Sequence, residues 1–404
     1  MSGTGEVGVL AQPFGAGFAG DPYGVYARLR AEGAVHRVAL PDGAAVWLVT
    51  READVREGLA DSRLSVDKKH SGSGFKGFSL PPALDANLLN MDAEDHLRLR
   101  RLVAQGFTPR HVEGMRASVQ AAVDGFADRL VARVEGEGVA DVVAEFARPL
   151  PLKVIGDLFA VPEGDRERFS RWVAGMLTPA SREELAGAVQ EMHRFFVGLV
   201  AARRAAPGGD VLSGLIAARD AEDRLNEDEL VSLAFLILMA GSENVQHLLG
   251  NGLFALLTHP GQLAALRERP ELLPEAVEEL LRYAHANHTA IRRFPTEPVE
   301  IGGVRIPAGD TVLLSLASAH RDPARYPEPD RFDIGRADKG HLALGHGLHY
   351  CLGAPLARMQ VTLGLGALLR RMPGMRLGVT AEALEWSTTF RFHALRALPV
   401  TGSR

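Results

Sequence analysis

Cys351 is the only cysteine of the chain and lies in the stretch "GHGLHYCLG", residues 345–353. His346 and His349 precede it, and Gly345 and Gly353 stand on either side of it. Three interpretations fit a thiol in such surroundings: a buried structural side chain, a catalytic nucleophile with a nearby histidine, or a ligand of a metal or haem. A single cysteine excludes an intrachain disulfide.

The residues around Cys351 favour the haem ligand. Pro355 suits the first turn of a helix, and a helix N-terminus favours a thiolate. Glycines permit turns with positive φ and the close approach of backbone to a flat ligand. A structural thiol needs neither feature, and a zinc site needs more thiols or a different histidine spacing. A haem thiolate explains the cysteine, the glycines and the helix end together.

The longer stretch "LGHGLHYCLGAPLAR" resembles the haem-binding loop of the cytochrome P450 monooxygenases, whose pattern is F-G-x-G-x-H-x-C-x-G. Every fixed position matches except the first, where Leu344 replaces Phe. The resemblance implies haem b as cofactor, with Cys351 as the iron ligand and Gly345 and Gly353 in the haem site. It extends over nearly the whole chain and points to the soluble bacterial branch of the family.

The stretch "EELLRY" contains Glu279 and Arg282, which share one face of a helix and can form an ion pair. Taken alone, they could be a solvated pair that contributes little to stability. The resemblance implies instead a structural pair, with a third member from the segment before the Cys loop. The sequence "PDRF" supplies Arg331 for that position.

Further cationic residues match the positions that hold the haem propionates in the family. "DAEDHLRLRRLV" contains His96 and Arg100, and Arg293 stands just ahead of "FPTEPVEIGG". With His349, the resemblance implies that these groups face the propionates, because buried carboxylates require cations opposite them. Each could otherwise be a surface charge, which is our interpretation of Arg101.

The chain contains one long apolar helix pattern, from Asn226 as N-cap to Pro260. Residues 230–240 are almost all apolar, which indicates a helix that is buried all round. "AGSEN", 240–244, then places polar residues in its middle. We expect a polar bulge with a function rather than a helix break with a surface turn. The stretch resembles the A-G-x-E/D-T oxygen-binding groove of the family: Ala240, Gly241 and Glu243 match, whereas Asn244 replaces Thr.

The rest of the sequence must position these residues. The chain has 404 residues, of which 46% are hydrophobic and 24% charged, values typical of a globular protein. The pattern is mostly helical from about 94 to 287, and a further helix is expected from about 354. Two β-hairpins are predicted, at 35–50 and 299–315. We expect one mainly α domain over 1–404 with small β-sheets. The resemblance implies the cytochrome P450 fold, with the haem between the long central helix and the Cys-loop helix.

Two glycine-rich segments have other interpretations. Residues 62–90 form a long Gly/Ser/Pro-rich stretch, which we expect to be a mobile substrate-access loop. Residues 15–20 and 72–77 match G-x-G-x-x-G, but neither follows a predicted strand, so we expect flexible loops rather than a dinucleotide site.

The resemblance implies a haem-thiolate monooxygenase that hydroxylates or epoxidises an apolar small molecule, in secondary-metabolite tailoring. It would use O2 and two electrons from a ferredoxin and its NAD(P)H-dependent ferredoxin reductase. Two alternatives stay open: a haem-binding sensor or carrier without turnover, and a Cys-dependent hydrolase using Cys351 with His346 or His349. A net charge of −5 gives no basic field for nucleic acid. Neither a membrane span nor a signal peptide is visible, so we expect a cytoplasmic protein.

Four segments are expected to line the substrate pocket: 62–90, 170–195, 284–291 and 387–390. In the third, His285, Asn287 and His288 would face a polar group of the substrate or solvent.

Overall fold

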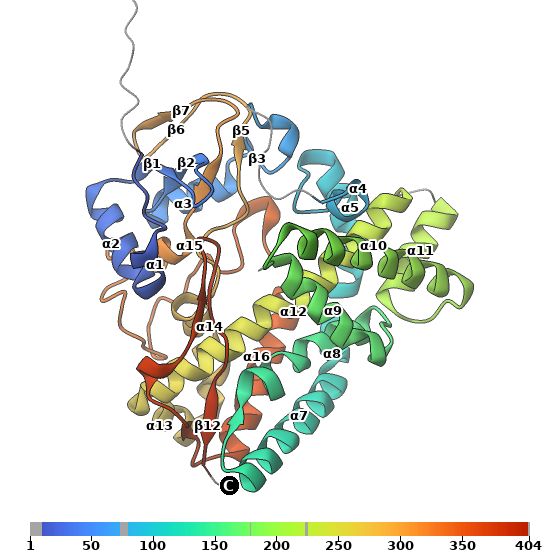
Figure 1. Cartoon of the computed structure of the whole chain (residues 1–404), viewed down its shortest axis with the longest axis vertical. Helices are drawn as coiled ribbons and strands as arrows, with labels where there is room; N and C mark the ends of the chain where they lie inside the picture. The colour runs from blue at the N-terminus through green and yellow to red at the C-terminus, as the bar shows by residue number, and fades with distance from the viewer. Residues whose placement is uncertain (1–9, 73–79, 178, 223–224, 403–404) are drawn as a thin grey trace, which may run out of the picture.

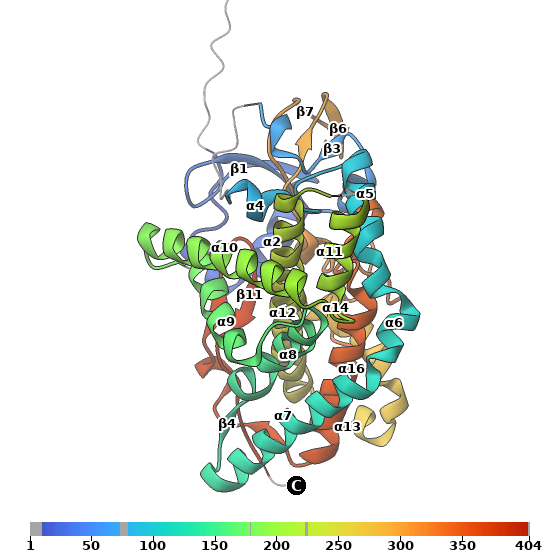
Figure 2. The same ribbon diagram turned by 90° about the vertical axis from the view of Figure 1, so that its right-hand side faces the viewer.

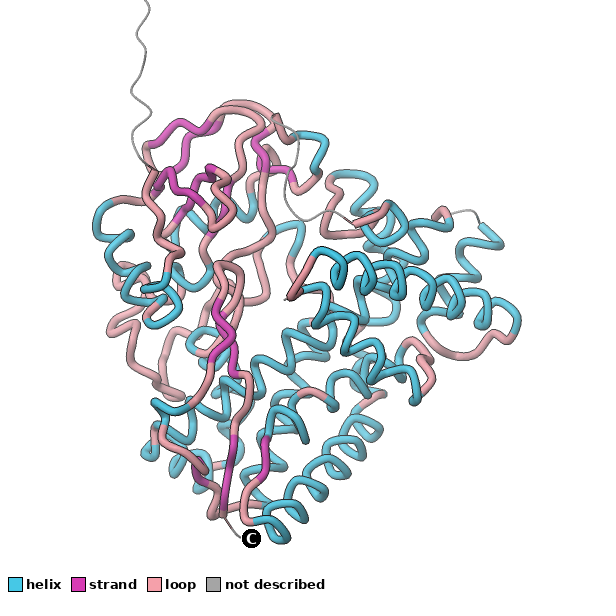
Figure 3. The backbone as a smooth tube through the Cα atoms, in the orientation of Figure 1, coloured by secondary structure: helices cyan, strands magenta, loops and turns pink. Residues whose placement is uncertain are grey.

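The computed structural model describes residues 10–72, 80–177, 179–222 and 225–402. Helices form most of it, and short strands are paired in small sheets, as expected (Figure 3). The α-helices are α1 (Ala16–Gly20), α2 (Pro22–Glu32), α3 (Glu52–Ala60), α4 (Pro82–Asp85), α5 (Ala93–Ala104), α6 (Pro109–Gly114), α7 (Arg116–Glu137), α8 (Pro149–Leu158), α9 (Glu163–Leu177), α10 (Arg182–Ala205), α11 (Val211–Glu222), α12 (Glu227–Thr258), α13 (Pro260–Glu268), α14 (Leu273–Tyr283), α15 (Leu316–Ala319) and α16 (Ala354–Arg371). The strands are β1 (Val35–Ala39), β2 (Ala45–Val49), β3 (Leu64–Ser65), β4 (Ala140–Asp141), β5 (Phe294–Pro295), β6 (Val299–Ile301), β7 (Val304–Ile306), β8 (Val312–Leu314), β9 (Arg376–Leu377), β10 (Trp386–Thr388), β11 (His393–Leu395) and β12 (Pro399–Thr401).

Helix α12 runs through the middle of the molecule and contacts α8, α10, α11 and α16 (Figures 1 and 2). It begins with the predicted capping box: the Glu229 N–H donates to Asn226 Oδ1 and the Asn226 N–H donates to Glu229 Oε2, both at 2.8 Å. Residues 230–238 are all buried, and all of them except Ser232 belong to the largest hydrophobic core. None of the described helices, α12 included, is long and apolar enough to cross a membrane.

The expected bulge in this helix is wrong, because α12 is α-helical without interruption through Gly241 and Asn244. Gly241 has a packing role: a Cβ there would lie 2.8 Å from Cγ1 of Ile155 on α8, so only glycine lets the two helices approach this closely. The Ser242 hydroxyl donates to the Leu238 carbonyl one turn earlier at 2.8 Å, which satisfies it inside the helix.

Both predicted hairpins are present. Strands β1 and β2 pair antiparallel, and so do β6 and β7. Strand β8 leaves the second hairpin and pairs in parallel with β2, which joins the two regions. A third hairpin, β10–β11, is tied to α12 because Asn251 donates to the His393 carbonyl at 3.0 Å and accepts from the Leu395 N–H at 3.2 Å. These bonds place a segment near the C-terminus beside the central helix.

The segment 62–90 contains β3 and α4, and its described ends are held in place. The Asn87 amide donates to the Ser232 hydroxyl of α12 at 2.9 Å, and Lys68 pairs with Asp85 at 2.5 Å. Its mobility and its role in substrate access stay predictions, since 73–79 lie outside the described residues. The loop expected over 15–20 is wrong, because Ala16–Gly20 form α1, and most of 72–77 lies outside the described residues.

Candidate functional site

The Cys loop is shaped by its backbone. The Cys351 N–H donates to the Leu344 carbonyl at 2.7 Å, which closes a tight turn. Gly345 and Gly347 have φ values of 77° and 71°, a region that disfavours other residues. A Cβ on Gly347 would lie 3.0 Å from Cα of Ala60 at the end of α3. Leu344 thus contributes its backbone to the turn, and its side chain packs against the largest core.

The Cys351 thiol stands just before α16, whose N-cap is Gly353, as the sequence predicts. Burial raises the pKa of the thiol above its ordinary value, although the Gly353 N–H and the positive charges of Arg100 and Arg358 act in the opposite direction. The helix end alone therefore does not produce the expected thiolate. A coordinated metal ion would supply the missing stabilisation, because it deprotonates a thiol ligand outright.

Basic side chains surround this loop, and two of them, His96 and Arg293, are buried. His96 and Arg293 are 1% and 2% exposed, and His96 Nδ1 and Arg293 Nη1 have no hydrogen-bond partner among the described residues. The His96 and His349 rings lie 4.3 Å apart, and Arg100 donates to the Tyr350 carbonyl at 2.6 Å. Burial lowers the pKa of Arg293 to about 10, despite the nearby Asp92 carboxylate. Burial, and then the positive charges of His349 and Arg100, lower the pKa of His96 to about 4, so this ring is neutral and can donate a hydrogen bond. The buried Arg293 guanidinium requires an anion, and the propionates of haem b fit both groups.

Asp92 belongs to this site, although the sequence analysis missed it. Its carboxylate accepts from His349 Nε2 at 2.8 Å, from the Ser65 hydroxyl at 2.6 Å and from the Val66 N–H at 2.8 Å. Burial raises its pKa, but these hydrogen bonds, that from His349 first, outweigh burial and hold the pKa below its ordinary value. Asp92 therefore fixes the His349 ring. The sequence signal that could have identified Asp92 is its position as N-cap of α5, four residues before His96.

The ion pair of α14 is buried, but its expected third member is wrong. Arg282 donates to Glu279 through Nε at 2.8 Å and Nη2 at 2.7 Å. The side chain of Arg331 is 56% exposed and pairs with Glu328. Arg336, 9% exposed, lies 3.4 Å from Glu279 instead. The turn at 333–336 reverses the chain and directs the later arginine inward, while Arg331 contributes only its carbonyl to Arg282.

The middle of α12 presents an accessible surface inside the fold. Ala240 and Asn244 are exposed, although the helix before and after them is mostly buried. Burial raises the pKa of the neighbouring Glu243 to about 7, so this carboxyl can carry a proton near neutral pH. The Asn287 amide donates to Asn244 Oδ1 at 2.9 Å. This bond joins Asn287, of the predicted lining segment 284–291, to α12, and we call the surface of residues 240–244 and Asn287 the groove. That this segment lines the substrate pocket stays a prediction.

His288 does not share in that surface. It is buried, with its ring 5.0 Å from that of Phe18 and 5.6 Å from that of Tyr26. It therefore faces neither solvent nor the groove. The β10–β11 hairpin, unlike His288, contacts α12 close to the groove. The ring of Phe392 stacks on that of His247, three residues beyond Asn244, with the ring centroids 5.4 Å apart.

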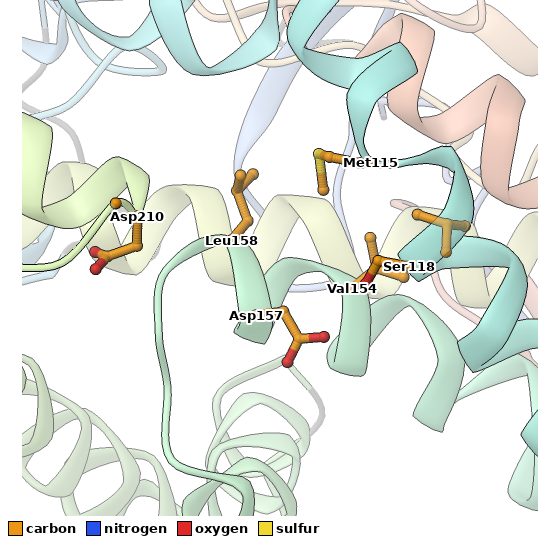
Figure 4. Close-up of a pocket in the computed structure, with 8 residues that line it drawn as sticks. Met115, Ser118, Val154, Asp157, Leu158 and Asp210 are labelled. Atoms are coloured by element: carbon orange, nitrogen blue, oxygen red, sulfur yellow. The ribbon is translucent and has the colours of Figure 1, made fainter.

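A separate pocket lies between α7, α8 and the segment that leads into α11 (Figure 4). Two carboxylates, Asp157 and Asp210, line it. Asp157 pairs with Lys153 and Arg166 at 2.6 and 2.7 Å, and Asp210 accepts from the Ser213 hydroxyl at 2.9 Å. Because both carboxylates already have partners, this pocket does not compete with the Cys351 region as a reaction site.

Comparisons with known proteins agree with this geometry. The family model "Cytochrome P450" matches residues 48–372. The chain is 45% identical over 400 residues to cytochrome P450 monooxygenase PikC of Streptomyces venezuelae, covering 99% of this chain and 94% of that protein. It is 41% identical over 392 residues to 6-deoxyerythronolide B hydroxylase of Saccharopolyspora erythraea, covering 94% and 96%. The solved structure of the tirandamycin C-bound P450 monooxygenase TamI superposes with a TM-score of 0.88 at 40% identity, covering 96% and 98%.

These matches span nearly the whole chain and confirm the predicted fold, enzyme class and haem b cofactor. The chain therefore belongs to the cytochrome P450 family and is a haem-thiolate monooxygenase.

Proposed function

We propose that this enzyme inserts one oxygen atom of O2 into an apolar secondary metabolite, by hydroxylation or epoxidation, in the bacterial cytoplasm. Two electrons come from a ferredoxin and its NAD(P)H-dependent reductase. The names of two relatives support this kind of substrate: one hydroxylates 6-deoxyerythronolide B, and the other is bound to tirandamycin C. The observation that carries the proposal is the pair of buried basic side chains beside Cys351, His96 and Arg293. Nδ1 of His96 and Nη1 of Arg293 have no hydrogen-bond partner in the part of the chain that the structure describes.

In this proposal each residue around the Cys loop has a defined part. Cys351 would hold the iron, and the Gly353 N–H acts to lower the pKa of its thiol. His96, Arg100, Arg293 and His349 would pair with the two propionates. When bound, haem supplies the oxygen binding and O–O cleavage that no side chain can provide. Gly345 and Gly353 leave room for the flat ring beside the loop backbone.

Residues of the α12 groove deliver protons to the reaction. Glu243 holds a proton near neutral pH, which is the condition for a general acid working at that pH. Asn244 is not a proton shuttle, but its amide can hold a water molecule or a substrate hydroxyl in place. Ala240 and Gly241 have little or no side chain, so the helix surface stays open beside these two residues. Oxygen activation then depends on Glu243 delivering protons through the molecule that Asn244 orients.

The ferredoxin docks on the surface next to the Cys loop. Arg101 and Arg110 are exposed there, as are the apolar side chains Leu97 and Tyr350. Arg358 of α16 is bound to Glu278 at 2.7 and 2.8 Å. We therefore assign the attraction of an acidic ferredoxin to Arg101 and Arg110 rather than to Arg358.

Reconstituted turnover tests the proposal. The protein, a ferredoxin, its reductase and NAD(P)H are incubated with metabolites whose binding perturbs the haem spectrum, under isotopically labelled O2. We expect a product that carries one labelled oxygen atom. Spectral binding without any substrate-dependent product, or oxygen derived from water, would overturn the proposal. The protein without reductase serves as the matched control and should form no product.

A further inference from the structure

The side-chain amide of Asn244 makes two hydrogen bonds, one through its nitrogen and one through its oxygen. Its Nδ2 donates to the Ala240 carbonyl, one turn earlier in α12, at 3.4 Å. Its Oδ1 accepts from Nδ2 of Asn287 at 2.9 Å. The second contact joins residues that are 43 positions apart, so it depends on the tertiary fold.

These two contacts decide which way both amides point. The Ala240 carbonyl can only accept, so a flipped Asn244 would place two oxygens against each other. Asn244 therefore turns its nitrogen to Ala240 and its oxygen to Asn287. Asn287 must then donate, and its own Oδ1 is left for another partner. The chain of donors and acceptors admits one arrangement.

Asn287 is itself held by backbone bonds to the β10–β11 hairpin. The His288 N–H donates to the Arg391 carbonyl at 2.7 Å, and the His393 N–H donates to the Ala286 carbonyl at 2.9 Å. Asn287 forms an isolated antiparallel bridge with Phe392. The hairpin is bound in turn to α12, so the Asn287 side chain starts from a fixed backbone.

We propose that Asn287 is a positioning residue that orients the Asn244 amide, so that Asn244 presents an N–H donor rather than its carbonyl to the groove. This inference rests on the proposed function of the groove. It assigns the carbonyl of Asn244 to Asn287 and one amide hydrogen to the Ala240 carbonyl, which leaves the second amide hydrogen for the bound molecule. At Asn244, a group that accepts a hydrogen bond is then held, and one that only donates is not.

The vibrational frequency of carbon monoxide in the reduced, haem-loaded protein reports this donor directly. Asn287→Asp cannot donate to Asn244 from a carboxylate, so the Asn244 amide turns its nitrogen to the new acceptor and withdraws it from the groove. We expect the CO stretch to move to higher frequency, because it loses a nearby donor. Asn287→Ala should broaden the band without the full shift, since the bond to Asn244 Oδ1 is lost while the Ala240 carbonyl still favours the same orientation.

Each substitution is repeated in an Asn244→Ala background, which controls for direct effects of the new charge. In that background, Asn287→Asp should give the same CO stretching frequency as Asn244→Ala alone. The effects of the two substitutions on the product formed per NAD(P)H consumed should also deviate from additivity by roughly twofold or more. An unchanged frequency in Asn287→Asp, or an equal shift in both backgrounds, would overturn the inference. A failure of the proposed function is distinguishable from these two outcomes, because the thiolate-type CO absorption band would then be missing.

Discussion

Replacing Glu279 by alanine removes the centre of a buried polar cluster. Its carboxylate, which has no exposed surface, accepts two bonds from Arg282 and a third from the Asp333 N–H at 3.0 Å. In Glu279→Ala the guanidinium of Arg282 keeps its bonds to the carbonyls of His320 and Pro329, but it has lost its counter-ion. A buried charge without a counter-ion is strongly destabilising.

The magnitude follows from this geometry. Removing one partner of a buried ion pair costs about 3–5 kcal/mol. Globular proteins gain about 2.1 cal/mol/K of entropy per residue on unfolding, so in this chain the loss should lower the unfolding midpoint by roughly 4–6 °C. The unfolding free energy of a typical protein is about 5–15 kcal/mol, so we expect a low yield of haem-loaded Glu279→Ala.

Thermal unfolding of the haem-loaded protein, followed by circular dichroism and by haem absorbance, measures the effect. Arg336→Ala should lower the midpoint as well, because that side chain is buried against Glu279. Arg331→Ala is the matched control and should change it by less than about 1 °C, as its pair with Glu328 is exposed. The assignment of this cluster is wrong if Glu279→Ala has the same unfolding midpoint as the parent protein. It is also wrong if Arg331→Ala lowers the midpoint as much as Arg336→Ala does.

Four further predictions concern the site and its surroundings. Cys351→His should lose the strongly red-shifted absorption band of the reduced, CO-bound protein, and a retained band would contradict thiolate ligation. Asn244→Ala should form less product per NAD(P)H consumed than either the parent or Asn244→Thr; equal coupling in all three would remove Asn244 from proton delivery. Reduction by ferredoxin should slow with added salt, and the salt dependence should weaken in Arg101→Ala; a rate indifferent to ionic strength would refute charge steering. Burial lowers the pKa of His288 to about 3, whereas the unfolded chain binds this proton below about pH 6.5. Stability should therefore fall as the pH drops below about 6.5, with a contribution of up to about 1.4 kcal/mol per pH unit that His288→Phe removes. Urea unfolding at about pH 7.5 and about pH 5 checks this. If the free energies of unfolding of the parent and of His288→Phe differ by the same amount at both pH values, the prediction is refuted.

Local sequence determined those features whose partners lie within a few residues. The Cys351 loop, the α16 start at Ala354 and the capping box at Asn226 are all short-range, because turns, helix ends and caps depend on neighbouring side chains and backbone. The spacing of Glu279 and Arg282 likewise places both on one helix face, so their pairing could be predicted.

Tertiary structure alone decided the contacts between distant segments. Arg336 rather than Arg331 reaches Glu279 because a turn reverses the chain. Asp92 holds His349 from 257 positions away, and Asn287 orients Asn244 across 43. No local pattern specifies such pairs, since their meeting depends on how whole helices and hairpins pack. The helix α12 stays regular across its polar residues for the same reason: its neighbours leave an accessible surface at Ala240 and Asn244, and the polar side chains are satisfied there without a bulge.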